Sequence, residues 1–316
     1  MVTYDAAKQP RKGVENMPKN MLEARGSCAI PMTPFDEKDR IDIDTLEREI
    51  EFIADSGAKG ICTPVMVSEF ESLSEEERRI MISVPIEVNA GRCAIIANVA
   101  AVNKNLAVSY AEYAQKMGAD AIIAMAPYVR PADAATIRQY YQGISDAVTI
   151  PIMIQNASNA AKLSPQQVVN VCEEIENVRY VKQEVLPGPV TISELLDMKS
   201  PAVEMVMSGF GGAFSLFDHA RGAAATIHAC EFCDVIQKVW DLLDAGNMEE
   251  AESLHAKLLP AIQLESLLGM TYAKEIMIRR GVFKNTSVRL RAGGLTDSDL
   301  RDVDRVWDSL QEYLAV

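Results

Sequence analysis

The sequence predicts a (β/α)8 barrel, an α/β fold of the TIM-barrel class, with a C-terminal helical extension. Eight short apolar runs alternate with segments of helical spacing over about 200 residues, as parallel strands joined by helices do. From residue 232 onward only helical patterns remain. A doubly wound open sheet is the alternative, but no G-x-G-x-x-G follows the first strand and there is no Walker loop. We therefore expect a closed barrel.

The apolar runs have the length of buried strands. We expect strands at residues 28–32, 60–65, 94–99, 121–125, 150–155, 178–182, 203–207 and 223–228.

Between these runs the apolar residues recur at helical spacing. We expect helices at residues 45–54, 75–88, 106–117, 134–147, 165–175, 190–198 and, more briefly, 214–220. Asp42, Ser74 and the Ser164-Pro165 pair are start signals for three of them. Gly57, Gly118 and Gly222 stand where a helix must end and the next strand begin.

Three regions follow from this rhythm. Residues 1–26 are polar without a steady period and predict an N-terminal arm. Residues 27–231 carry the predicted barrel. Residues 232–316 predict a C-terminal helical domain, with helices at 235–245, 249–259, 262–280 and 298–314.

Composition narrows the function. A formal net charge of -14 disfavours binding to nucleic acid or to an anionic membrane, because the chain would repel phosphate. No run approaches the length of a membrane span, and the N-terminus has no apolar signal core. Six cysteines spread through apolar segments are typical of reduced thiols, and the single C-x-x-C, Cys230 and Cys233, is more simply two packed thiols than a zinc or redox site. We expect a cytoplasmic protein.

The predicted sixth strand carries the most unusual residues. Side chains alternate along a strand, so Tyr180, Lys182 and Glu184 share one face. A buried lysine and carboxylate are costly unless they pair or perform chemistry. A desolvated lysine can act as a nucleophile toward a carbonyl, and the iminium that forms is an electron sink. Glu184 could then move a proton. The alternative is a plain Lys–Glu pair at the barrel rim.

Chemistry in such barrels lies at the C-terminal ends of the strands. The candidate residues there are Thr33, Ser68, Glu69, Asn98, Tyr128, Gln155, Asn156, Ser208, Gly209 and His228. The residues predicted to bind substrate are Thr33, Val67, Ser68, Glu69, Gln155, Ser208, Gly209 and His228. Each has an ordinary alternative: Ser68 and Glu69 could begin a helix, Tyr128 could pack, and His228 could be a satisfied core histidine.

Several motifs in register resemble the dihydrodipicolinate synthase / N-acetylneuraminate lyase family, from about residue 26 to the C-terminus. They are A-I-P-M-T-P-F at 29–35, S-E-F-E-S-L-S at 68–74, G-R at 91–92, G-A-D-A at 118–121, P-Y at 127–128, and residues 177–182. The resemblance implies a (β/α)8 lyase, with Lys182 as the Schiff-base lysine and a 2-keto acid as the small-molecule substrate. It also suggests a homotetramer built from dimers.

Departures from the family pattern narrow the activity. The family's G-T-T-G-E segment, which binds the keto-acid carboxylate, is here Val65 to Glu69, so backbone amides near Val67 and the Ser68 hydroxyl are the remaining donors. The family's proton-shuttling tyrosine falls on Gln155, and an amide is no acid or base at neutral pH. The arginine of the dihydrodipicolinate synthases falls near Ala160. Lys182-x-Glu184 and the stretch 259–281 are most similar to the L-2-keto-3-deoxyarabonate dehydratase subgroup.

These observations give a leading hypothesis and three alternatives. The first is a Schiff-base dehydratase of a 2-keto-3-deoxy sugar acid. In it Lys182 forms the iminium, Glu184 is the acid and base, and substrate hydroxyls are oriented by Gln155, Tyr128 and His228. The alternatives are a pyruvate-releasing aldolase that uses Tyr128 or a water, a 4-hydroxy-tetrahydrodipicolinate synthase-like enzyme, and a non-catalytic binding or scaffold barrel. No metal site and no organic cofactor are expected, because no cluster of ligands stands out.

Overall fold

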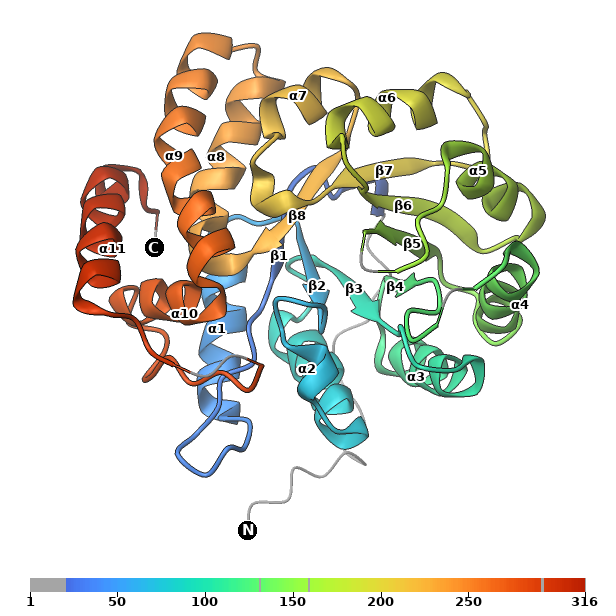
Figure 1. The fold of residues 1–316 in the computed structure, drawn as a ribbon, viewed down its shortest axis with the longest axis horizontal. Helices are drawn as coiled ribbons and strands as arrows, with labels where there is room; N and C mark the ends of the chain where they lie inside the picture. Colours follow the sequence, from blue (N-terminus) through green and yellow to red (C-terminus); the bar gives the residue numbers. More distant parts are fainter. Residues whose placement is uncertain (1–20, 131, 159, 291–292, 316) are drawn as a thin grey trace.

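The computed structural model describes residues 21–130, 132–158, 160–290 and 293–315 (Figure 1). Most of the predicted N-terminal arm, residues 1–20, lies outside the described residues. The short 3-10 helix Met21–Glu23 leads directly into the first strand.

Eight parallel strands close into one barrel in sequence order, which confirms the predicted fold class (Figure 1). Every observed strand overlaps its predicted run, and the ends differ by at most two residues. The strands are β1 Gly26–Ile30, β2 Gly60–Thr63, β3 Ala94–Asn98, β4 Ala121–Met125, β5 Ile152–Ala157, β6 Val178–Glu184, β7 Met205–Ser208 and β8 Ala225–Ala229.

A helix follows each strand and covers the outside of the barrel (Figure 1). The helices are α1 Ile43–Asp55, α2 Glu75–Asn89, α3 Lys104–Met117, α4 Ala134–Ser145, α5 Pro165–Glu174, α6 Gly188–Asp197, α7 Ser215–Ala220 and α8 Cys233–Asp244. Their starts follow the predicted signals. The Asp42 side chain accepts a hydrogen bond from Thr45 N–H, and Ser74 and Ser164 each form a capping box with the residue three places on.

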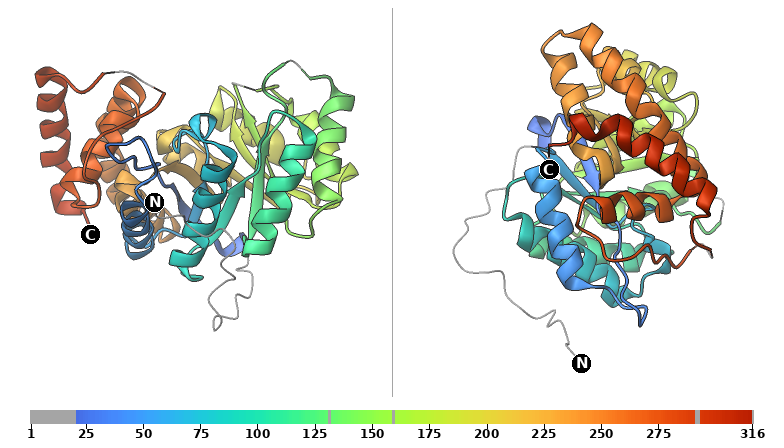
Figure 2. Two further views of the ribbon diagram at one scale, coloured as in Figure 1. Left: turned by 90° about the horizontal axis from the view of Figure 1, so that it is seen from below. Right: turned by 90° about the vertical axis from the view of Figure 1, so that its left-hand side faces the viewer.

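Three further helices stand at one side of the barrel, α9 Met248–Leu268, α10 Met270–Arg279 and α11 Asp297–Leu310 (Figure 2). The expected break near Pro260 is wrong, because α9 runs through this proline. The helix ends instead at Gly269, whose φ of 67° lies outside the helical region that side-chain-bearing residues prefer. The C-terminal part is helical, as predicted.

The predicted division between residues 231 and 232 stays a prediction. Helix α8 packs on β1 as the last helix of the barrel ring. We propose that the extension begins after α8, at the turn before Met248.

Apolar side chains form two layers around the strands. One layer fills the space between strands and helices, and the other fills the barrel interior with residues such as Ile30, Met153, Tyr180 and Met207. Polar residues lie beyond this interior layer, at the C-terminal ends of the strands. None of the helices formed by the described residues has both the length and the apolar character needed to cross a bilayer.

A buried ion pair fastens the C-terminal helices to the barrel mouth. Lys274 Nζ on α10 lies 3.1 Å from Glu69 Oε1 in the loop after β2, and both side chains are buried. Lys274 also donates to Thr33 O, and Glu69 Oε2 accepts from the backbone N–H groups of Arg289 and Leu290. Burial lowers the pKa of Lys274, while the carboxylate of Glu69 opposes this shift.

We expect Glu69→Gln to destabilise the protein by about 3–5 kcal/mol, because it leaves the Lys274 ammonium buried without its counter-charge. Adding Lys274→Met should recover part of this loss, since no unpaired charge then remains. The free energy of unfolding in denaturant measures both effects. Glu174→Gln, which breaks the exposed pair with Arg138, is the matched control and should change little. Equal losses for Glu69→Gln and Glu174→Gln would contradict this account.

Candidate active site

A cavity of about 220 Å³ lies at the C-terminal ends of the strands. Its polar lining side chains are Gln155 on β5, Lys182 and Glu184 on β6, His228 on β8, and Glu265 and Ser266 on α9. The rest of its wall is apolar and comes from Ile30, Val65, Met66, Val67, Phe210, Gly211, Ile227, Ala229 and Ile262. Both the barrel and the C-terminal helices therefore build this site.

Lys182 and Glu184 point to the same face of β6, as strand alternation predicts. Lys182 Nζ lies 3.0 Å from Glu184 Oε1, and the side chains are 4% and 18% exposed. Two charges in so little contact with water need each other, because a buried ion without a partner is strongly destabilising. The pair is the feature from which the chemistry of the cavity follows.

Gln155 completes this group from the neighbouring strand. The β5–β6 register sets Gln155 beside Lys182. Its Nε2 donates a hydrogen bond of 3.0 Å to Glu184 Oε2, so each carboxylate oxygen has one donor. Gln155 thus fixes the orientation of Glu184 toward Lys182. The amide does this without being able to give up or take a proton at neutral pH.

Gly209 permits the position of Glu184. A Cβ on Gly209 would overlap the Glu184 carboxylate, so any other residue would displace it. Gly209, predicted as a substrate-binding residue, therefore lies against the carboxylate without lining the cavity. Its neighbour Ser208 is buried and also absent from the lining.

The loop after β2 uses most of its polar groups internally. The Ser68 hydroxyl donates to Pro31 O at 2.6 Å and accepts from Val65 N–H at 3.2 Å. Thr33 Oγ1 donates to Ser68 O at 2.6 Å. Ser68, Thr33 and Glu69, all predicted to bind substrate, hold this loop in shape. Among the described residues the Val67 N–H has no hydrogen-bond partner, and Val67 does line the cavity.

His228 contributes to the wall of the cavity, but both of its ring nitrogens are used within the protein. Nε2 is 2.8 Å from Ser27 Oγ and Nδ1 is 2.7 Å from Ala229 O. Burial lowers the pKa of this imidazole to about 4, so it is neutral near pH 7. The structure makes His228 a packed histidine, and its predicted contact with substrate hydroxyls stays a prediction.

Tyr128 lies in a neighbouring hollow of about 270 Å³ that also contains Val129, Arg130 and Ala160. Its ring packs edge-on against Phe70, with the centroids 6.0 Å apart. Burial raises the pKa of its phenol. Tyr128 is absent from the residues that line the Lys182 cavity. Its catalytic role stays a prediction.

Two groups of cavity residues are not predicted by the sequence patterns. Phe210 and Gly211 belong to the glycine-rich turn after β7, which the sequence presents only as a flexible turn. Ile262, Glu265 and Ser266 belong to α9, about 80 residues after Lys182. Helical spacing shows that α9 exists, but nothing in that pattern says which of its faces meets the barrel mouth.

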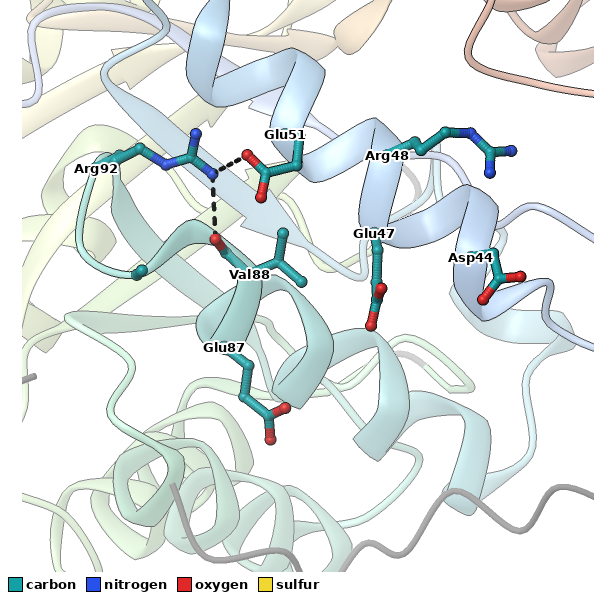
Figure 3. A pocket seen from close by; sticks show the side chains of 8 residues that line it. Asp44, Glu47, Arg48, Glu51, Glu87, Val88 and Arg92 are labelled. Atoms are coloured by element: carbon teal, nitrogen blue, oxygen red, sulfur yellow. Dashed lines mark hydrogen bonds and ion pairs between the residues drawn. The ribbon is translucent and has the colours of Figure 1, made fainter. Parts of the chain in front are cut away.

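A larger hollow, of about 760 Å³, lies between α1 and α2 on the outside of the barrel (Figure 3). Figure 3 shows Arg92 bonded to Glu51 and to the carbonyl of Val88, with Glu47 and Glu87 also at the rim. These residues form a charged surface groove without a buried nucleophile. Within the described residues no three His, Cys, Asp or Glu side chains gather in a way that could hold a metal ion. The six cysteines are free and buried.

Comparison with known proteins now places the chain. The model of the Dihydrodipicolinate synthetase family matches residues 23–307. The chain belongs to this family. The resemblance inferred from the motifs is thereby confirmed. The comparisons support a lyase activity of the kind found in this family.

Relatives in this family have different names. The chain is 27% identical over 270 residues to "L-2-keto-3-deoxyarabonate dehydratase" of Azospirillum brasilense, covering 84% of this chain and 87% of the relative. It is also 27% identical over 243 residues to "4-hydroxy-tetrahydrodipicolinate synthase" of Methanocaldococcus jannaschii, covering 73% and 80%. Among solved structures, dihydrodipicolinate synthase from Rhodopseudomonas palustris superposes with a TM-score of 0.84 at 24% identity, covering 92% of this chain and 98% of that one. At that identity the structural likeness shows the fold alone.

The buried, neutral His228 makes stability depend on pH. The unfolded chain protonates this imidazole near its ordinary pKa of about 6.5, whereas the folded protein does so only near 4. The neutral His228 therefore contributes to the free energy of unfolding above pH 6.5. This contribution, up to about 3 kcal/mol, is lost as the pH falls toward 4. Between pH 7.5 and 5 the free energy of unfolding should therefore fall more in the wild type than in His228→Gln. Equal falls in the two proteins would contradict a buried neutral imidazole.

Proposed function

We propose that this protein is a Schiff-base dehydratase of a 2-keto-3-deoxy sugar acid, with a substrate like L-2-keto-3-deoxyarabonate. One observation carries the proposal: the buried Lys182 amine lies 3.0 Å from a carboxylate that Gln155 holds in place, inside a closed-barrel cavity. Such an arrangement suits covalent catalysis on a carbonyl.

In the first step Glu184 takes a proton from the Lys182 ammonium, and the free amine attacks C2 of the keto acid. Glu184 returns its proton to the carbinolamine hydroxyl, which leaves as water, so that an iminium forms between Nζ and C2 and Glu184 is again a carboxylate. This cationic carbon draws electrons from the C2–C3 bond and acidifies the C3 hydrogens. The Val67 N–H is a backbone donor of the cavity wall without a partner among the described residues, and we propose that it binds the C1 carboxylate.

In the second step a base removes a C3 proton and the C4 hydroxyl departs. Glu184 can do both, because the proton that it takes from C3 is the one that the C4 hydroxyl needs in order to leave as water. Hydrolysis of the iminium consumes one water, which balances the water released when the iminium formed, and frees Lys182. The net change is the loss of one water from the substrate, with no electrons transferred.

The cavity offers fewer suitable groups for carbon–carbon cleavage than for dehydration. An aldolase needs a base on the C4 hydroxyl, and the strand position that carries the family's phenol holds Gln155. Tyr128, the predicted substitute, belongs to the neighbouring hollow. The aldolase therefore stays the runner-up. The name of the Azospirillum brasilense relative supports the dehydratase, and the name of the Methanocaldococcus jannaschii relative supports the synthase alternative.

The homotetramer that the family resemblance suggests is likewise a proposal. One solved structure of similar fold, at 18% identity and a TM-score of 0.82, is described as a monomeric dihydrodipicolinate synthase variant. Sedimentation of the purified protein separates these states directly.

The proposal is tested by incubating the protein with a panel of 2-keto-3-deoxy pentonates and hexonates, with and without borohydride. We expect an adduct on Lys182 in intact-mass and peptide measurements, and a product that is one water lighter than the substrate. Lys182→Met is the control and should give neither adduct nor product.

Other outcomes would overturn parts of the proposal. Release of pyruvate together with an aldehyde would make the protein an aldolase. A Lys182 adduct that appears only with pyruvate would favour the synthase alternative. Absence of an adduct with every keto acid would mean that the lysine is structural and the barrel non-catalytic.

A further inference from the structure

Glu265 is the second carboxylate of the active-site cavity. It projects from α9, whereas Lys182 and Glu184 project from β6. Among the described residues that line the cavity, Lys182 is the only one with a cationic side chain. The described residues offer the Glu265 carboxylate no hydrogen bond or ion pair. Its charge is therefore not compensated by a partner, and it is open to a ligand.

The glycine turn after β7 brings both carboxylates to the same place. Glu184 lies against Gly209, and Glu265 Oε2 would be 3.3 Å from a Cβ on Gly211, which has a φ of +63°. Ile262, one turn earlier on α9, would be 3.0 Å from that same Cβ. The missing side chains at 209 and 211 thus let β6 and α9 present their carboxylates to one cavity.

The surroundings of Glu265 raise the pKa of its carboxyl group. Burial raises its pKa to about 7. The pKa of the neighbouring Glu231, after β8, is raised by its own burial and by the charge of Glu265. Among the described residues, the hydroxyl of Tyr272 on α10 has no hydrogen-bond partner. Across the cavity, the charged groups are Lys182 and Glu184. A carboxyl that is half protonated near pH 7 can donate to a hydroxyl or accept from one.

We propose that Glu265 is a specificity-determining residue that binds the distal hydroxyls of the keto acid and rejects a chain that ends in a second carboxylate. The inference rests on the proposed function, because it takes C2 to be attached to Lys182 and C1 to lie at Val67. The C4–C5 end then extends toward Glu265 and Ser266. A terminal hydroxyl hydrogen-bonds with Glu265, whereas a terminal carboxylate meets a like charge without a cation to offset it.

Two keto acids differ only in the group in question. A 2-keto-3-deoxypentonate ends in CH2OH, and 4-hydroxy-2-oxoglutarate has a carboxylate in its place. In competition at equal concentrations with borohydride, all Lys182 adducts of each acid can be counted by intact mass. We expect the wild type to prefer the hydroxyl-terminated acid by at least about tenfold, and Glu265→Gln to lose most of this preference. Glu252→Gln, on the exposed side of α9, is the matched control and should keep it.

The same competition is repeated at pH 6 and pH 8. A purely structural role of Glu265 would not change how the preference between the two acids depends on pH. Because Glu265 loses its proton over this range, the wild-type preference should grow with pH, and the preference of Glu265→Gln should change less. An unchanged preference in Glu265→Gln at both pH values, with adducts still formed, would overturn the inference and leave the proposed function standing. Absence of any adduct in the wild type would overturn the proposed function, and the inference with it.

Discussion

The structure of the active site depends on one constraint: a lysine inside a parallel barrel must have a partner. Glu184 meets this need two residues further along the same strand, and Gln155 holds Glu184 from the adjacent strand. Gly209 then has to lack a side chain so that the carboxylate has room. Two adjacent strands, β5 and β6, and the turn after β7 thereby support one ion pair. In the proposed reaction this pair supplies both the nucleophile and the proton carrier for a carbonyl in the cavity.

A second buried pair, Lys274 with Glu69, joins the C-terminal helices to the barrel mouth. Glu69 also orders the segment after α10 by accepting two backbone N–H groups. Glu69 belongs to the loop after β2, which is joined to the segment after β1 by the hydrogen bonds from Ser68 to Pro31 O and from Thr33 to Ser68 O. Within the described part of the chain, this loop leaves the Val67 N–H without a partner at the cavity. Helix α9, which carries Glu265, packs against α8, α10 and α11.

Local patterns were sufficient to predict the barrel and its reactive face. Apolar runs of strand length gave the strands within two residues, and alternation along β6 correctly put Lys182 and Glu184 side by side. Tertiary relationships could not be read in this way. Glu69 looked like a substrate ligand because its partner, Lys274, is more than 200 residues away in the chain. His228 looked available because its bond to Ser27 crosses from β8 to β1. Glu265 gave no signal, since a glutamate on an amphipathic helix is usually solvated.

The central claim is that Glu184 carries protons for a covalent reaction at Lys182, and Glu184→Gln tests it most directly. The substitution keeps the size of the side chain and its contact with Gln155 while removing the acid and base. Borohydride trapping and product formation should be measured on the same samples with a 2-keto-3-deoxypentonate. The account predicts that the Lys182 adduct still forms, because water can take the ammonium proton in place of Glu184, while formation of the dehydrated product slows by about a hundredfold or more. Normal product formation by Glu184→Gln would contradict it.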